Sequence, residues 1–101
     1  MVEIIETEQF VKWSVELKDP IAPVKIQTRI RRLSVGNPGD VRPVGARVSE
    51  LRIDWGPGYR VYFIYRAPRI VIILGGGTKQ TQGRDIREAR ALARQLTRGL
   101  R

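Results

Sequence analysis

Four side chains in the second half of the chain combine residue types that can contact phosphate groups and stack on bases. Arg52 lies in "ELRIDW", Arg60 and Tyr62 lie in "YRVYF", and Lys79 follows the glycine-rich stretch "GGGT". Side chains of a strand alternate between its faces, so Arg52, Arg60 and Tyr62 are predicted to face away from the apolar residues of the same strands. Arginine matches phosphate with a planar fork of donors, and an aromatic ring can stack on an unstacked base. This spacing indicates a candidate RNA-binding surface, which we expect to be an open sheet face.

Two simpler explanations for this face stay open. An antiparallel sheet often has one solvated face that carries charge. Arg52 can also pair across the strands with an acidic neighbour. Lys79 favours a binding role, because it follows a glycine-rich loop at the end of a strand, where binding groups tend to lie. That loop lacks the GxxxxGK[ST] spacing of a P-loop, and no GxGxxG opens a helix.

The chain contains no cysteine and no histidine. Disulfides, thiolate zinc sites and cysteine nucleophiles are therefore excluded, as are the usual metal ligand and the usual general base near neutral pH. We expect no metal and no cofactor. The N-terminal stretch "MVEIIETEQF" is acidic where a signal peptide is basic, and the run "IVIILGGG" is too short to span a bilayer. A cytoplasmic protein is therefore the expectation.

The positive charge is concentrated in the second half of the chain. The formal net charge is +9, with eight basic and seven acidic side chains in residues 1–50 and eleven basic and three acidic in residues 51–101. Such a basic half attracts a polyanion, most often nucleic acid. A solubilising arginine-rich surface and an acidic protein partner both remain alternatives.

Hydrophobic periodicity and turn residues predict one domain of the α+β class over residues 1–101, in the order β-αα-βββ-α. Thr7 and Asp19 are predicted to cap the two consecutive helices, the second of which starts at Pro20. This helical hairpin is expected to cover one face of a small, mainly antiparallel sheet. The predicted segments are strand 2–6, helix 8–17, helix 20–33, loop 34–46, strand 47–55, strand 59–66, strand 70–74, flexible segment 75–84 and helix 85–96.

Four stretches together resemble the RelE/ParE superfamily of toxins from bacterial type II toxin–antitoxin modules, and in particular its HigB-like group of addiction-module killer proteins. They are "FVKWSVELKD", "RIRRLSVGNPGDVRPVG", "ELRIDWGPGYRVYF" and "IVIILGGGTKQTQGRDIREARALA". The resemblance covers most of the chain and implies a RelE-like fold, similar to microbial RNases. It also implies cleavage of mRNA in the ribosomal A site and neutralisation by a cognate antitoxin. That partner is usually a small helix-turn-helix protein, and the pair typically binds operator DNA.

The resemblance assigns roles to individual residues. The "GYR" motif places Arg60 as a phosphate-contacting residue, with Arg52 on the neighbouring strand and Lys79 in the loop that carries basic groups. These three are the predicted catalytic residues. In the implied reaction the ribose 2′-OH attacks the adjacent phosphate without a metal, and the three cations stabilise the charge that builds up. Some relatives carry a tyrosine or histidine as proton carrier where this chain has Gln82 and Asp85.

Further contacts to RNA are expected from the C-terminal helix and the segment before it. The predicted RNA-binding residues are Tyr62, Gln82, Arg84, Arg87, Arg90 and Arg94, and Arg98 continues the same basic stripe. This stripe can instead face the antitoxin, or only solvent. Two other functions also stay open: a gyrase poison like ParE, and a basic nucleic-acid-binding module without catalysis.

Overall fold

The computed structural model describes residues 1–98, which form three helices and a five-stranded sheet. Together they make the α+β fold expected from the sequence. The elements are β1 (Glu3–Glu6), α1 (Glu8–Val15), α2 (Ala22–Ser34), β2 (Val41–Gly45), β3 (Val48–Ile53), β4 (Tyr59–Ala67), β5 (Ile70–Thr78) and α3 (Gln82–Thr97).

The five strands form a mixed sheet in the order β1-β5-β4-β3-β2. Strands β2 to β5 pair antiparallel with their neighbours in sequence, and β1 joins the edge of β5 in parallel. The pairing of β1 runs from Glu3 opposite Ile70 to Glu6 opposite Ile73, so β1 covers only the first part of β5. The predicted strands on either side of "WGPGY" and of "RAPR" pair as antiparallel hairpins, β3 with β4 and β4 with β5.

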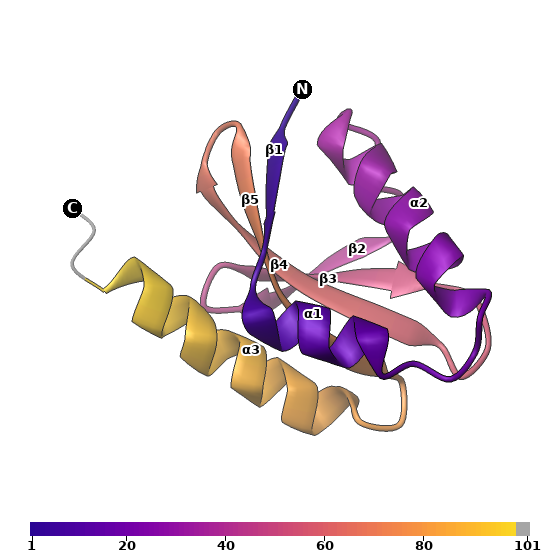
Figure 1. Cartoon of the computed structure of the whole chain (residues 1–101). Coiled ribbons are helices and arrows are strands. Elements are labelled where there is room, and N and C mark those ends of the chain that lie inside the picture. The colour runs from indigo at the N-terminus through magenta and orange to yellow at the C-terminus, as the bar shows by residue number, and fades with distance from the viewer. Residues whose placement is uncertain (99–101) are drawn as a thin grey trace.

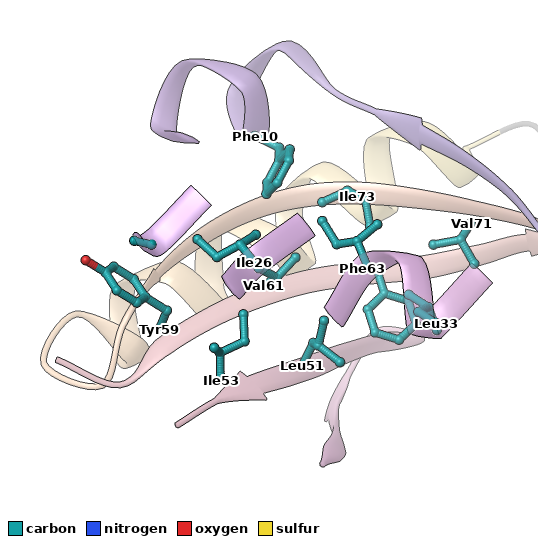
Figure 2. Close-up of a cluster of buried hydrophobic side chains, with 12 residues drawn as sticks. Phe10, Ile26, Leu33, Leu51, Ile53, Tyr59, Val61, Phe63, Val71 and Ile73 are labelled. Carbon is teal, nitrogen blue, oxygen red and sulfur yellow. The ribbon is translucent and has the colours of Figure 1, made fainter. Parts of the chain in front are cut away.

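The helices cover both faces of the sheet (Figure 1). Helices α1 and α2 lie on one face, where α1 packs on β5 and α2 on β3. Figure 2 shows the core beneath them, with Phe10, Ile26 and Leu33 of the helices pointing toward strand residues such as Leu51 and Phe63. Helix α3 covers the opposite face and closes a second cluster of buried side chains: Val48, Tyr62, Ile64, Ile72, Leu74, Ala89 and Ala93.

Of the two predicted helix caps, Thr7 is confirmed as the N-cap of α1, whereas Asp19 is wrong because the N-cap of α2 is Ile21. The hydroxyl of Thr7 accepts a hydrogen bond from the backbone N–H of Phe10, as an N-cap does. Asp19 accepts one from the N–H of Ile21, so it closes a turn ahead of α2. The helix itself begins at Ala22 and not at Pro20, which corrects the predicted boundary.

Two predictions for the loops are wrong. The predicted loop 34–46 contains strand β2, which tolerates Pro43 because it is an edge strand. The predicted flexible segment 75–84 is ordered: β5 continues through the three glycines to Thr78, and α3 already begins at Gln82. Within residues 1–98, no helix combines the length and the apolar character that crossing a membrane requires.

Candidate functional site

The sheet face that carries Arg52, Arg60 and Tyr62 is covered by α3, so the predicted open face is wrong. Tyr62 is fully buried and Arg60 is only 9% exposed, whereas the Arg52 side chain is 31% exposed. The cause is the apolar stripe of α3, which must pack against something. Since α1 and α2 occupy the other face, α3 packs on this one.

Glu50 is a fully buried carboxylate that binds three polar side chains of this face. Its Oε1 accepts a hydrogen bond from Nε of Arg52 at 2.9 Å. Its Oε2 accepts hydrogen bonds from the hydroxyl of Tyr62 at 3.0 Å and from Nε2 of Gln82 at 2.8 Å. The acidic partner of Arg52 therefore lies on its own strand, and the buried Tyr62 offers no exposed ring for the expected base stacking.

These contacts shift the pKa of both titratable partners. Burial alone raises the pKa of the Glu50 carboxyl, but the hydrogen bonds from Arg52, Gln82 and Tyr62 outweigh burial and hold that pKa below its ordinary value. Burial and the nearby charge of Glu50 raise the pKa of the Tyr62 phenol far above its ordinary value. Glu50 is thus a carboxylate and Tyr62 a neutral phenol across the physiological range.

Arg60 is a buried cation of this face that forms no ion pair within residues 1–98. It lies directly opposite Arg52 on the neighbouring strand, and opposite Gly77 on the other side. Its Nε is buried without a hydrogen-bond partner in the described part of the chain. Like charges at directly opposite positions are destabilising, and so is a buried donor left unpaired. The carboxylate of Glu50 is already hydrogen-bonded to Arg52, so it does not neutralise Arg60. The Arg60 guanidinium can therefore bind an anion from outside the protein.

Lys79 is exposed and lies beside the turn between β3 and β4. Its backbone N–H donates to the carbonyl of Gly58 at 2.8 Å, which fixes it just beyond the end of β5. Because Arg60 pairs with Gly77 and Lys79 follows two residues later, both cations belong to the same end of the sheet. The backbone register thus places the predicted catalytic residues Arg52, Arg60 and Lys79 at one end of the sheet.

The glycines of β5 make room for side chains from two helices. A Cβ at Gly77 would collide with the carboxylate of Asp85, and a Cβ at Gly76 would collide with the ring of Trp13. Asp85 is buried, accepts a hydrogen bond from the hydroxyl of Thr81, and forms an ion pair with Arg84 at 3.3 Å. Asp85 therefore has a structural partner set of its own at the start of α3.

The predicted RNA-binding residues of α3 divide into two groups. Arg87, Arg94 and Arg98 are exposed and offer their charge to solvent or a partner, and the exposed Arg84 pairs with Asp85 and Glu88. Arg90 and Gln82 are engaged inside the protein instead. Nε of Arg90 donates to the backbone carbonyl of Val44, and Gln82 donates to Glu50. The continuous basic stripe predicted for this helix is therefore interrupted at Arg90.

Glu50 is the residue that the sequence interpretation missed. It stands two positions before Arg52, on the same face of the same strand. An acidic residue on a strand face shared with arginine and tyrosine is the available signal, since alternation places all three on one side.

A metal site has no obvious ligands in residues 1–98, because His, Cys, Asp and Glu side chains form no group of three or more there.

The chain was also compared with known proteins. No protein-family model matches it. A protein of Haemophilus influenzae, described as uncharacterized, is 45% identical over 95 residues, which are 94% of this chain and 96% of the Haemophilus protein. At this identity and coverage the two proteins share one fold and one ancestry, and the chain belongs to the same family as the Haemophilus influenzae protein.

Proposed function

We propose that this protein is the toxin of a type II toxin–antitoxin pair, in the HigB-like group of the RelE/ParE superfamily, and that it cuts mRNA on the ribosome. The observation that carries the proposal is Arg60, which is nearly buried and whose Nε has no hydrogen-bond partner among residues 1–98. A buried cation without a carboxylate is costly, and binding of a phosphate group would supply the missing acceptors.

In this proposal the residues stabilise charge and hold geometry. The 2′-oxygen of the ribose attacks the adjacent phosphorus, the bond to the 5′-oxygen breaks, and a 2′,3′-cyclic phosphate forms. Arg60 contacts the nonbridging phosphate oxygens, where negative charge builds. Arg52 is held by Glu50 at 2.9 Å and keeps an exposed edge toward the same substrate. Lys79 supports the leaving oxygen from the end of β5.

The ionisation states of this site favour a reaction that depends on the ribosome. Glu50 has a lowered pKa and three donors, and Tyr62 has a strongly raised pKa, so neither group suits proton transfer near neutral pH. General acid–base catalysis is commonly worth about 10²–10⁴-fold. A ribosome that holds the mRNA in line would compensate through positioning. The proposal therefore places the protein in the cytoplasm, with mRNA and the ribosome as its substrate complex.

The antitoxin follows from the same proposal. A protein with a net charge of +9 is best neutralised by an acidic partner that covers its cations. We assign this role to a small helix-turn-helix protein, through which the pair contacts operator DNA.

The test is cleavage of mRNA on programmed ribosomes, mapped by primer extension. The wild-type protein should cut within the A-site codon, and ribosome-free RNA should stay intact. Arg60→Met should abolish the cuts while retaining the aliphatic stem of the side chain. Arg66→Met is the matched control, because Arg66 is exposed on the same strand and face, six residues along β4 from Arg60.

Each alternative function has its own outcome. Growth arrest without any cut in the mRNA, together with inhibited DNA supercoiling, would show that the protein is a gyrase poison and not a nuclease. RNA binding that needs Arg60 but gives no cleavage and no growth arrest would leave only a nucleic-acid-binding module.

A further inference from the structure

Strand β5 has a sheet edge that is only half used. On the side away from β4, its residues Ile70–Ile73 pair with β1. The chain then turns away from β5 after β1, and Thr7 donates hydrogen bonds to the backbone carbonyls of Ile73 and Leu74. Past Leu74, the outward peptide groups of Gly75–Gly77 have no hydrogen-bond partner among residues 1–98. An unpaired edge of this kind is a template for another strand.

A groove runs along this edge, between α1 and α3. Its volume is about 620 Å³, and its floor includes Leu74, Gly75 and Gly76. Trp13 of α1 forms one wall and Leu92 of α3 belongs to the other. The unpaired backbone is therefore accessible, and side chains on either face of an added strand would meet apolar surface.

Gly75 has no steric reason to be glycine within the protein. Its φ angle is not in the left-handed region, and a Cβ built on it would have nothing within 4 Å. Gly76 and Gly77 differ, because Trp13 and Asp85 fill the space beside them. A strand glycine without an internal cause indicates a place where another chain approaches the backbone closely.

We propose that the groove along Gly75–Gly77 binds an extended segment of an acidic partner protein, which adds a strand to the free edge of β5. The free backbone edge favours a peptide ligand, because the unpaired N–H and C=O groups of β5 can form main-chain hydrogen bonds with another extended strand. The net charge of +9 disfavours a second copy of this chain. The proposal does not depend on the nuclease activity.

The groove also specifies the segment. Arg84 and Arg98 line its wall at the two ends of α3. Fourteen helical residues span about 21 Å, which corresponds to roughly six residues of an extended strand. Asp85 and Glu88 also line the groove and pair with Arg84, which leaves Arg98 as the cation of the lining outside these ion pairs. The segment should therefore have an apolar centre, facing Trp13 and Leu92, and an acidic residue near the Arg98 end.

The experiment is selection of random linear peptides of about eight residues, displayed on phage, against the full chain. The selected sequences should show an apolar centre with Asp or Glu near one end. A synthetic peptide of that sequence should bind with a Kd below about 100 µM. Amide hydrogen exchange followed by NMR should then show new protection at those amides of Gly75–Gly77 that point away from β4.

Gly75→Val should weaken binding by about tenfold or more, because its side chain fills the groove. It leaves the fold intact, since a Cβ there has open space. Gly83→Ala is the matched control and should bind normally, because Gly83 lies outside the groove and a Cβ there makes only an ordinary contact with Arg87. If Gly75→Val fails to fold, Ala91→Glu serves instead: Ala91 is exposed, lines the groove, and would place a repelling carboxylate there.

Several results would overturn the proposal. They are the absence of any selected peptide in the stated affinity range, protection of another surface, or full binding to both groove variants. A concentration-dependent dimer that protects the same outward amides of β5 would assign the edge to a second copy. An RNA oligonucleotide that displaces the peptide and protects the same amides would assign the groove to nucleic acid.

Discussion

Replacing Arg60 by methionine should raise the free energy of unfolding, because the buried arginine destabilises the folded protein. Its side chain is 9% exposed, its Nε has no partner in the described residues, and Arg52 stands directly opposite. An unpaired buried donor costs about 1–3 kcal/mol, and a like charge at the opposite cross-strand position adds about 0.2–1 kcal/mol. Methionine retains the packing of the stem without the charge. Partial hydration of the guanidinium reduces the sum, so we expect a gain of about 1–3 kcal/mol in the free energy of unfolding.

Urea unfolding at neutral pH and low salt measures this gain, and thermal unfolding should rise by about 4–8 °C for each kcal/mol. Inorganic phosphate provides the second arm. At ten times its Kd, an anion that binds only the folded state adds about 1.4 kcal/mol. The wild type should gain this stability and Arg60→Met should not. A loss of stability on substitution, or equal gains with phosphate in both proteins, would refute the reasoning that Arg60 awaits an anion.

The remaining predictions concern the buried network and the glycines of β5. Glu50→Ala should lower the free energy of unfolding by about 2–4 kcal/mol, since it leaves buried donors unpaired, whereas Glu50→Gln should cost less than half as much in the same urea titration. Because the folded pKa of Glu50 lies below its ordinary value of 4.5, its contribution is present above that pH and is lost as the pH falls toward the folded pKa. The stability difference between wild type and Glu50→Gln should therefore shrink on acidification below about pH 4.5, and a constant difference would contradict the assignment. Gly76→Ala should cost about 1–3 kcal/mol and alter the near-UV circular dichroism of Trp13, while Gly75→Ala should change stability by less than about 0.5 kcal/mol; equal effects would show that Trp13 does not pack as described.

The sequence predicted the alternation of faces in β3 and β4 correctly, because a strand has a period of two whatever packs against it. It also predicted the apolar stripe of α3, but not the surface that the stripe covers. With α1 and α2 assigned to one face, the remaining face was the place for a third amphipathic helix. A third amphipathic helix on that face buries Tyr62 and Arg60, which an open face would leave exposed.

The other errors come from contacts that local propensity does not contain. Strand β2 was predicted as loop because Pro43 and Gly45 disfavour strands, and only its position at the sheet edge makes them tolerable. The end of β5 was predicted as flexible because three glycines follow one another. Two of them are required by Trp13 and Asp85, which reach β5 from distant parts of the chain.

The placement of β1 has a consequence for how the protein is made. Glu3–Glu6 forms its ladder with Ile70–Ile73, so the first strand to be synthesised waits for the last one before it can pair. Closing so long a loop is slow compared with forming a hairpin. During translation, the strands β2 to β4 can pair as they emerge, but α1 lacks β5 beneath it until residue 78 has left the ribosome. The cations of this sheet therefore reach their final geometry only after β5 has emerged, which delays any activity of the nascent chain.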